Sequence, residues 1–304
     1  MAAAHGADMS FDAWMRERLV EVERALEQWV PADAPAGLGD AMRYGVLGAG
    51  KRLRPLLVLA AGEAVGGDRE AALRAAAAAE LIHAYSLVHD DMPCMDNDVL
   101  RRGKPTVHVE FGQAQAMLAG DAMQALAFEV LTPEHGVAPA LQARLCALLA
   151  RAAGHDGMAG GQAVDLASIG RALSEPELRR MHERKTGALL RASVLMGAAC
   201  GHTDAAQWQA LSDYGDAIGL AFQVVDDILD VTQASDVLGK TAGKDQDANK
   251  PTYVSLLGLD GARRRAADLH ARALAALATV ERTGRDGATA RLAALADRVV
   301  HRQN

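Results

Sequence analysis

The pattern of hydrophobic and polar positions predicts helices along almost the whole chain, whereas alternating patterns typical of strands are hard to find. From Phe11 to Val30, apolar residues recur with helical period. The longest such run, Arg69–Met92, is rich in alanine and meets its first proline at Pro93, which disfavours helical geometry in the residue before it. We therefore expect a buried helix that ends at Met92. Further helices are predicted over residues 53–65, 106–131, 138–153, 174–200, 203–231, 253–257, 261–279 and 287–301.

Short clusters of Gly, Pro and Asp separate these helices, at residues 31–39, 66–68, 154–157 and 239–250. None of them resembles a flexible linker, and no internal repeat is present. Half of the residues are hydrophobic but only 4% are aromatic, so the core must consist of Ala, Leu, Val and Met, as in closely packed helices. The sequence predicts an all-α protein in which residues 1–304 form one domain, a single large helical bundle.

Charge and cysteine content exclude several functional classes. The net charge is -7 and no long Lys/Arg block occurs, so a nucleic-acid partner is not expected. The three cysteines are widely spaced and lack metal-binding spacing, which argues against disulfides and zinc. The first residues carry no secretory signal, and no stretch approaches the ~18–20 apolar residues of a membrane span. We expect a cytoplasmic protein.

Two clusters of three aspartates are the strongest chemical signal. One closes the long alanine-rich helix, and the other lies inside a later apolar helix. Two like charges ~5 Å apart cost roughly 3 kcal/mol at an effective dielectric near 20, so such clusters need cations. Hard carboxylate oxygens suit Mg²⁺, which binds one or two carboxylates together with substrate phosphates. The predicted metal ligands are Asp90, Asp91, Asp96, Asp226, Asp227 and Asp230.

The spacing within each cluster has a geometric consequence. Asp226 and Asp230 are four residues apart, so a helix places them ~40° apart on one face. Asp90 and Asp96 would point to different faces of an unbroken helix. Because Pro93 must break that helix, we expect Asp96 to return in a turn and to share a metal with Asp90. One such cluster alone could be a solvated helix face or a cap; two in apolar helices favour metal binding.

Basic residues lie where they could complete a diphosphate site. Gly50, Lys51 and Arg54 belong to a glycine-containing turn before a helix, a setting that also suits a solvated basic turn. Arg101 and Arg102 follow the first aspartate cluster almost at once. A third group, which includes Lys240 and Lys250, follows the second cluster in the same order.

At this point the sequence resembles the trans-prenyl diphosphate synthase family, particularly its bacterial farnesyl diphosphate synthases. The likeness runs from GAGKRLRP to LGKTAGKDQDANK and includes DDMPCMD, RRGKPT and QVVDDILD. Ala49 stands where many relatives have glycine. The resemblance implies the isoprenoid synthase fold, a helical bundle around a deep central cavity, and a homodimer. It also implies Mg²⁺ as cofactor, about three ions with diphosphate bound.

The resemblance further implies roles for individual residues. Isopentenyl diphosphate would be bound by Gly50, Lys51, Arg54, His83 and Arg102. The allylic diphosphate would be held with Mg²⁺ by Arg101, Lys185 and Lys240, and Lys250 would also contact substrate. Thr186 and Gln223 would face the reacting carbons, and Gln162 and Asp165 would line the cavity. The catalytic set is thus Asp90, Asp91, Arg101, Lys185, Thr186, Gln223 and Lys240.

The resemblance also implies that product length depends on Tyr85 and Ser86, because in this family the residues five and four positions before the first aspartate help set the floor of the pocket. Five helical residues span ~7.5 Å, so a tyrosine ring there would block a tail longer than about three isoprene units. This favours farnesyl diphosphate over geranyl or geranylgeranyl diphosphate as product. Alternatively, Tyr85 is simply a core aromatic residue.

Other functional classes remain open from the residues alone. An HD-type metal phosphohydrolase would use His83 together with the neighbouring pair His89 and Asp90. This interpretation leaves the second aspartate cluster unexplained. A terpene cyclase would also ionise a prenyl diphosphate, but then Lys51 and Arg54 would be surplus. A non-catalytic prenyl-diphosphate-binding protein would not need two complete metal motifs.

Overall fold

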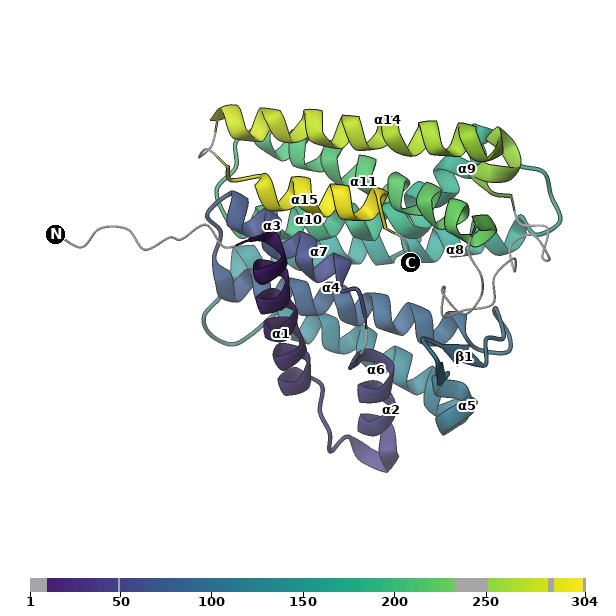
Figure 1. Cartoon of the computed structure of the whole chain (residues 1–304). Coiled ribbons are helices and arrows are strands. Elements are labelled where there is room, and N and C mark those ends of the chain that lie inside the picture. Colours follow the sequence, from purple (N-terminus) through teal and green to yellow (C-terminus); the bar gives the residue numbers. More distant parts are fainter. Residues whose placement is uncertain (1–9, 49, 233–250, 284–286, 303–304) are drawn as a thin grey trace.

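The computed structural model describes residues 10–48, 50–232, 251–283 and 287–302, and helices make up almost all of them (Figure 1). This confirms the all-α prediction. The helices are α1 (Phe11–Trp29), α2 (Leu38–Val46), α3 (Leu53–Ala64), α4 (Arg69–Asp90), α5 (Val107–Phe111), α6 (Gln113–Leu131), α7 (Pro139–Ala153), α8 (Met158–Ala167), α9 (Glu175–His182), α10 (Ala188–Ala199), α11 (Ala205–Thr232), α14 (Tyr253–Thr283) and α15 (Ala290–Val300). A 3₁₀ turn, η1 (Pro35–Gly37), precedes α2, and a π-helical turn, η2 (Glu183–Gly187), joins α9 to α10.

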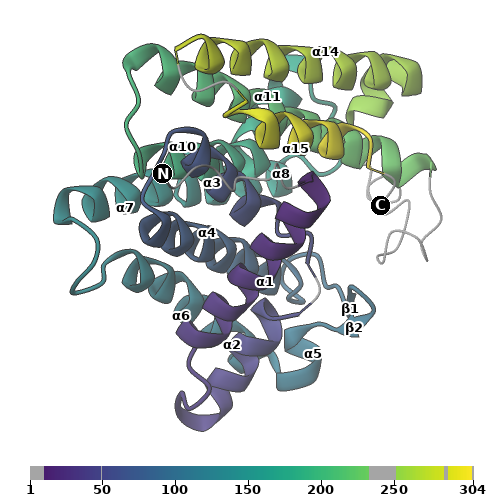
Figure 2. The same ribbon diagram turned by 60° about the vertical axis from the view of Figure 1, so that its left-hand side comes forward.

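The helices pack as a bundle in which α10 connects two groups. α4 lies against α3 and α6, α11 lies along α14, and α10 contacts α3, α4 and α11. α1 crosses this bundle steeply and packs on α3 and α4 (Figure 1, Figure 2). The C-terminal ends of α4 and α11 reach the same side of the molecule in both views. The bundle therefore brings the two aspartate clusters to one end.

The core is built from small side chains, as the composition predicts. Ala75–Ala79 of α4 are completely buried, so neighbouring helices approach α4 on several sides. The main hydrophobic cluster extends from α1 to α15, and a smaller one joins α9, α11 and α14. The division into one domain remains a prediction.

Several predicted helices are divided in the structure. The one predicted over residues 106–131 is α5 and α6, because Gly112 has a φ of 86° between them. The one predicted over residues 174–200 is α9, η2 and α10. The two predicted over 253–257 and 261–279 both lie in α14, and the break expected between them is present as a kink at Gly258, where φ is 69°. Apolar periodicity therefore predicts where helix forms, but it does not predict the break at Gly112 or the π-helical turn η2.

Two helices and one hairpin were not predicted. α2 and α8 are short and each contains two glycines, which lower helix propensity, so tertiary packing rather than local preference forms them. A two-residue hairpin, β1 (Leu100–Arg101) and β2 (Lys104–Pro105), pairs Arg101 with Lys104. It places Arg101 next to the end of α4.

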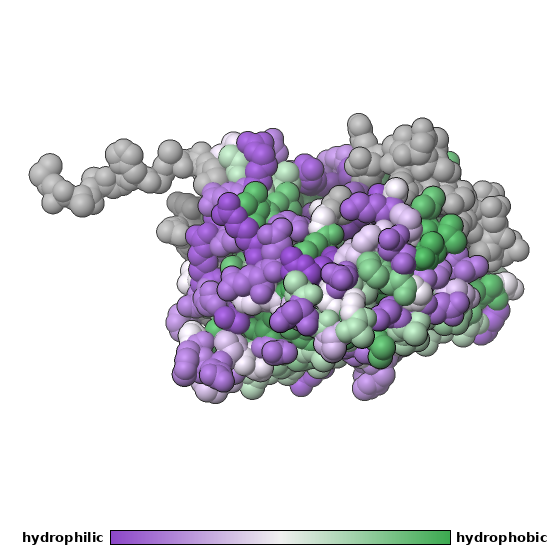
Figure 3. Space-filling model, turned by 90° about the horizontal axis from the view of Figure 1, so that it is seen from below, coloured by the Kyte–Doolittle hydropathy of each residue, from purple (hydrophilic) through white to green (hydrophobic). Residues whose placement is uncertain are grey.

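The lengths and compositions of the helices also bear on membrane insertion. Among the described residues, no helix combines the length and apolar character needed to cross a bilayer. The face at the bottom of Figure 1 shows hydrophobic residues interrupted by hydrophilic ones (Figure 3).

Candidate active site

A cavity of about 340 Å³ gathers the basic residues singled out from the sequence. It lies between the start of α3, the middle of α4, the β1–β2 hairpin and α11. Among the residues that line it are Lys51, Arg54, His83, Arg101 and Arg102. Residues from three separate parts of the sequence thus form one cationic cavity, a setting that suits a multiply charged anion.

A buried arginine holds the turn that presents Lys51. Arg52 has a left-handed φ of 46° and is 3% exposed. Its guanidinium donates to carboxylate oxygens of Glu23 and Glu80, each at 2.6 Å, and to the carbonyl oxygens of Val46 at 2.6 Å and Gly48 at 3.1 Å. With its five N–H donors spread over these acceptors, Arg52 fixes the chain immediately before α3.

The cavity is strongly electropositive in its interior. Burial lowers the pKa of Arg54 to about 10. Burial also lowers the pKa of His83 well below its usual value, and the nearby charges of Arg54 and Arg102 act in the same direction. His83 is therefore neutral, and its imidazole can donate or accept one hydrogen bond without adding charge.

Gly50 lies in close contact with two arginine side chains of this cavity. A Cβ atom at Gly50 would lie 3.0 Å from Nη1 of Arg102 and 3.4 Å from Nη1 of Arg52. The absence of a side chain therefore lets the hairpin arginine approach the turn before α3. The contribution of Gly50 to the cavity is the space that it leaves for the Arg102 guanidinium.

The first aspartate cluster folds back on itself at the end of α4. The backbone N–H of Asp96 donates to the carbonyl oxygen of Asp90 at 2.9 Å, and that of Asp98 donates to the carbonyl of Asp91 at 3.1 Å. This confirms that the chain turns back after Pro93. We predicted that this helix ends at Met92, but α4 ends at Asp90. The reason is that the carbonyl oxygens of Asp90 and Asp91 accept hydrogen bonds from the residues after the turn and not from the next helical turn.

Burial makes the Asp90 carboxyl easier to protonate. Its pKa is raised to about 6, chiefly by burial and also by the negative charges of Asp96 and Asp91. The charges of Lys185 and Arg101 oppose that shift without cancelling it. A cation bound beside Asp90 would restore the ionised form.

Asp91 is held differently from Asp90. Nε of Arg101 lies 2.8 Å from Oδ2 of Asp91, and Nη2 of Arg101 lies 2.5 Å from Oδ1. The Asp91 side chain is 3% exposed and that of Arg101 is 33% exposed. The carboxylate therefore orients the guanidinium, which lines the cationic cavity.

The second aspartate cluster lies in unbroken helix, as predicted, but its members have different partners. Asp226 lines the cationic cavity, and Nη2 of Arg302 approaches its Oδ1 at 3.2 Å. Asp227 is buried and accepts hydrogen bonds from Nε2 of Gln223 at 3.0 Å and from the backbone N–H of Tyr253 at 2.8 Å. Asp227 thus anchors the start of α14. Asp230 is buried one turn further along.

A third group of predicted residues surrounds η2. Nζ of Lys185 lies 2.5 Å from Oδ2 of Asp165, which belongs to α8. The hydroxyl of Thr186 donates to Oε1 of Gln223 at 3.2 Å. Because Gln223 also bonds Asp227, η2 and α11 share one hydrogen-bonded chain. π-Helical turns such as η2 are frequent at functional sites.

Close packing of α8 positions this group. A Cβ atom at Gly161 would lie 2.2 Å from the backbone nitrogen of Lys185, so α8 lies directly against η2. Gln162, the next residue, has both amide atoms buried without a hydrogen-bond partner in the part of the chain that the structure describes. Unsatisfied buried amides are rare and are typical of sites that bind a further molecule.

The two residues expected to limit product length lie on α4, outside the lining of the cationic cavity. Tyr85 is half-buried, its hydroxyl interacts with Gln124 of α6, and its ring meets that of His89 edge-on at 5.8 Å between centroids. The Ser86 hydroxyl donates to the carbonyl of His83 at 2.9 Å. Their role remains a prediction.

The sequence groups Arg52 with Lys51 and Arg54 as three cations beside glycines but does not predict its buried contacts, and it indicates no role for Glu80 or Arg302. Lys240 and Lys250 fall outside the described residues. Arg302 stands 76 residues from Asp226 in the sequence, and no local pattern indicates their contact. Arg302 also bonds the carbonyl of Phe222 at 3.0 Å and stacks over its ring.

The donor set fits Mg²⁺ held jointly by protein and substrate. Within the described ranges, no three or more His, Cys, Asp or Glu side chains are already grouped as a metal site. Each cluster instead offers carboxylate oxygens beside a cationic cavity. This fits a hard cation that takes one or two carboxylates and completes its shell with water and phosphate oxygens.

Comparison with known proteins agrees with this geometry. Residues 35–283 match the polyprenyl synthetase family model. The farnesyl diphosphate synthase of Geobacillus stearothermophilus is 45% identical over 264 residues, which cover 86% of this chain and 89% of the relative. A chloroplastic geranylgeranyl pyrophosphate synthase of Capsicum annuum is 44% identical over 305 residues, which cover 100% and 82%.

A solved structure gives the same result for the fold. The geranyltransferase of Helicobacter pylori, complexed with magnesium and isoprenyl diphosphate, is 32% identical, has a TM-score of 0.84 and covers 97% of this chain and 98% of its own. The isoprenoid synthase fold expected from the resemblance is thereby confirmed. The chain is a prenyltransferase that belongs to the polyprenyl synthetase family.

Proposed function

We propose that this protein condenses isopentenyl diphosphate with dimethylallyl and geranyl diphosphate to give (2E,6E)-farnesyl diphosphate, with Mg²⁺ as cofactor. The observation that carries this proposal is the single cavity in which Lys51, Arg54, His83 and Arg102 meet Asp226. A diphosphate could bind the cationic wall there while a second diphosphate occupies the space between the aspartate clusters.

The residues have distinct tasks in this reaction. Asp90, Asp91 and Asp96 on one side, and Asp226, Asp227 and Asp230 on the other, would hold Mg²⁺, with Asp227 acting mainly through the hydrogen bonds that fix α11 and α14. Mg²⁺ supplies Lewis-acid stabilisation of the charge that develops on the departing diphosphate. Arg101, Lys185 and Lys240 add fixed positive charge at the same group.

The bond changes follow from this charge arrangement. The allylic C–O bond breaks and its electron pair leaves with the diphosphate, which yields an allylic carbocation. The double bond of isopentenyl diphosphate, held at Lys51, Arg54 and Arg102, then attacks that carbon. The resulting cation loses a proton to the departed diphosphate. Thr186 and Gln223, linked at 3.2 Å, offer oxygen atoms to the reacting carbons.

Farnesyl diphosphate is favoured by Tyr85, whose ring stands five residues before Asp90 on α4. Its contact with α6 limits how far the ring can swing aside. Geranylgeranyl diphosphate is the second candidate product, because the relatives named above include synthases of both chain lengths at similar identity.

An HD-type phosphohydrolase is set aside, because His83 faces arginine side chains and the family model matches most of the chain. We also propose a cytoplasmic homodimer. Met117 and Leu118, exposed on α6, are candidates for the subunit contact.

The test is incubation of the purified protein with isopentenyl diphosphate and either allylic starter, with Mg²⁺ or with EDTA. The products are dephosphorylated and identified by mass spectrometry. Farnesol that forms only with Mg²⁺ supports the proposal. Geranylgeraniol would keep the chemistry and reject the product length, and the absence of any condensation would reject both.

A further inference from the structure

One carboxylate lies buried in the alanine-rich part of α4 and has no role in the reaction proposed above. Glu80 directly follows Ala75–Ala79 and is 2% exposed. Glutamate is almost never fully buried unless it is paired, because the loss of hydration is costly. The position of Glu80 in the core therefore needs an explanation.

Glu80 belongs to the wall of the cationic cavity. It lies three residues before His83 on the same face of α4, and both residues line the cavity. Asp98 and Asp226 are the other described carboxylates in that lining, and each of them is partly exposed. Glu80 is thus the buried negative charge among the cations of the cavity.

Glu80 contacts Arg52 directly. Nη1 of Arg52 donates a hydrogen bond to Oε1 of Glu80 at 2.6 Å, and the two side chains are almost completely buried. The same guanidinium uses Nη2 to bind the carbonyl oxygens of Val46 and Gly48. Because a guanidinium is planar and rigid, a contact that fixes Nη1 also fixes Nη2. Glu80 therefore helps to hold the turn before α3.

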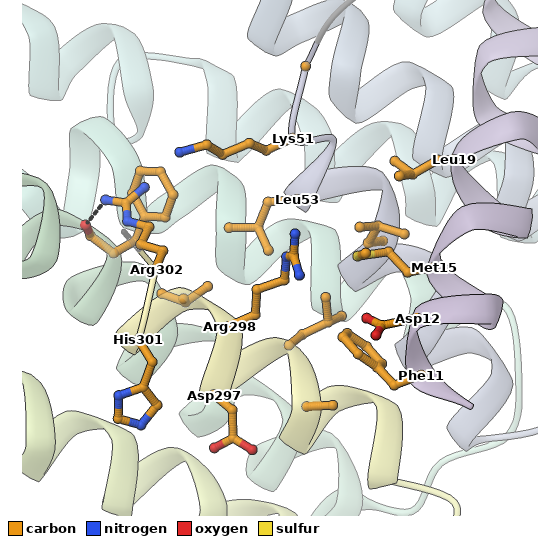
Figure 4. A pocket seen from close by; sticks show the side chains of 16 residues that line it. Phe11, Asp12, Met15, Leu19, Lys51, Leu53, Asp297, Arg298, His301 and Arg302 are labelled. Carbon is orange, nitrogen blue, oxygen red and sulfur yellow. Dashed lines mark hydrogen bonds between the residues drawn. The ribbon is translucent and has the colours of Figure 1, made fainter. Parts of the chain in front are cut away.

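The turn before α3 also carries Lys51. Figure 4 shows the Lys51 side chain extending from the start of α3 toward Arg302, and both residues line the cationic cavity. Arg52 is the next residue after Lys51, so a shift of Arg52 would move the backbone of Lys51 as well. The contact between Glu80 and Arg52 is thus linked to the position of a substrate-binding lysine.

Glu80 also acts on the charges of two further arginines. Burial lowers the pKa of Arg54 to about 10, and the charge of Glu80 opposes that shift. Burial lowers the pKa of Arg102 too, and Glu80 again opposes the shift, whereas the charge of Arg52 adds to it. The carboxylate therefore offsets the mutual repulsion of guanidinium groups that share one cavity.

We propose that Glu80 is a positioning residue for the diphosphate of isopentenyl diphosphate: it is the built-in counter-charge that keeps Arg52, Arg54 and Arg102 assembled while the cavity is empty. The identity of that ligand rests on the proposed function. Without Glu80 the arginines would repel one another, and a buried N–H group of Arg52 would lose its acceptor.

Removal of this carboxylate has two opposite effects on an anion. It makes the cavity more positive, which attracts a diphosphate, and it releases the cations from their positions. The second effect is the larger, because removal of one partner from a buried ion pair leaves a charge that its surroundings do not compensate. A set of donors that is no longer preorganised binds its ligand more weakly.

The test is calorimetric titration with isopentenyl diphosphate in EDTA, together with steady-state kinetics in Mg²⁺. Glu80→Gln keeps the shape and one acceptor oxygen but removes the charge. It should raise the Kd and the KM for isopentenyl diphosphate at least tenfold and change the KM for the allylic diphosphate less than twofold. Glu80→Asp keeps the charge at a shorter reach and should raise the same constants about threefold.

Glu23→Gln is the matched control. It removes the other carboxylate from Arg52, which Nε of Arg52 contacts at the same distance of 2.6 Å. The Glu23 side chain is 31% exposed and is not among the residues that line the cavity, so water can replace it. This variant should raise the KM for isopentenyl diphosphate less than threefold. An effect as large as that of Glu80→Gln would overturn the proposal.

Three further outcomes would overturn it. They are an unchanged KM for isopentenyl diphosphate in Glu80→Gln, an equal rise of both KM values, and a Glu80→Asp enzyme that binds as weakly as Glu80→Gln. A purely structural role would lower kcat with the fraction of folded enzyme and leave both KM values unchanged. If Glu80→Gln did not fold, Glu80→Asp would decide alone, and an unchanged KM for isopentenyl diphosphate would then reject the proposal.

Inorganic diphosphate separates this inference from the proposed function. If the wild type did not bind isopentenyl diphosphate, the proposed function would fail. Inorganic diphosphate that binds Glu80→Gln at least tenfold more weakly than the wild type would still support the role of Glu80 as counter-charge. Equal binding of inorganic diphosphate to the two proteins would contradict that role whatever the enzyme makes.

Discussion

Arg101 binds Asp91 through two nitrogens, Nε and Nη2, so a residue of the β1–β2 hairpin is locked to the last turn of α4. The hairpin has only two residues in each strand and could not hold this position by its backbone pairing alone. The ion pair therefore determines where the guanidinium lies in the cationic cavity.

Arg101→Lys should lower kcat/KM about 100-fold and the free energy of unfolding by about 1–3 kcal/mol, because lysine keeps the charge but cannot form the paired contact. Steady-state kinetics and urea unfolding measure the two effects. Lys104→Gln, on the exposed strand of the same hairpin, is the control. Wild-type activity in Arg101→Lys would show that the geometry of the pair is unimportant.

Asp90 makes Mg²⁺ binding pH-dependent. Since burial raises its pKa to about 6, its carboxylate is protonated in a growing fraction of molecules as the pH falls through 6. The Mg²⁺ concentration for half-maximal activity should therefore rise several-fold between pH 7.5 and pH 5.5. In Asp90→Asn, activity should fall at least 100-fold, and the remaining Mg²⁺ dependence should lose this pH response. A pH-independent Mg²⁺ requirement in the wild type would contradict this role.

Tyr85→Ala should lengthen the product. Removal of the ring opens space on α4 about one and a half turns before Asp90, so geranylgeranyl diphosphate or longer products are expected. Mass spectrometry of the dephosphorylated products measures the chain length, and Tyr85→Phe serves as the control that keeps the ring. If Tyr85→Ala made nothing longer than the wild type does, Tyr85 would be only a packing residue between α4 and α6.

His182 should make the fold sensitive to acid. Burial lowers its pKa to about 4, and neither ring nitrogen has a hydrogen-bond partner among the described residues. In the unfolded chain its pKa is near 6.5, so the unfolded state binds the proton first as the pH falls. The free energy of unfolding therefore decreases as the pH falls from about 6.5 towards 4, and His182 accounts for roughly 3 kcal/mol of that decrease.

His182→Phe tests that linkage. The ring of His182 stacks on that of Tyr253 at 5.8 Å between centroids, and phenylalanine can keep this contact without a titrating group. The variant should be more stable than the wild type at pH 5 and show a smaller difference at pH 7.5, as measured by urea unfolding at both values. If the two proteins differed in free energy of unfolding by the same amount at both pH values, His182 would not be the source of the acid sensitivity.

Gly161→Ala should damage both stability and activity. The added methyl group would meet the backbone of Lys185 at 2.2–2.5 Å, and backbone atoms cannot move aside as a side chain can. We expect a loss of about 1–3 kcal/mol in the free energy of unfolding, together with a reduced kcat as η2 shifts. Val164→Ala on the exposed face of α8 is the control. Unchanged thermal unfolding and kcat would mean that α8 and η2 can separate freely.

The sequence was sufficient to predict the helical class and the turn after α4, whereas only the family resemblance implied that Lys51, Arg54, His83 and Arg102 share one site. Apolar periodicity marks the long helices, and Pro93 forces the turn that returns Asp96 to Asp90. These features depend on residues near one another in the chain. They follow from local backbone preferences and from the spacing of side chains along a helix.

The remaining features depend on contacts between distant residues. Arg52 is held by Glu23 and Glu80, 29 and 28 residues away, so its left-handed φ angle has no local signature. α8 contains Gly160 and Gly161, which lower its intrinsic helix propensity, and its close packing against η2 stabilises it. The π-helical turn itself has the composition of an ordinary helix. In each case, tertiary packing rather than intrinsic propensity decided the structure.

The two hydrogen bonds at Asp227 affect how mutagenesis of the second aspartate cluster should be interpreted. One oxygen accepts from the Gln223 amide and the other from the Tyr253 backbone. Asparagine has only one acceptor oxygen, so Asp227→Asn must place its NH₂ group against another donor. An inactive Asp227→Asn enzyme would therefore be ambiguous evidence about metal coordination. The same substitution at Asp226, which lines the cavity, isolates the loss of charge more cleanly.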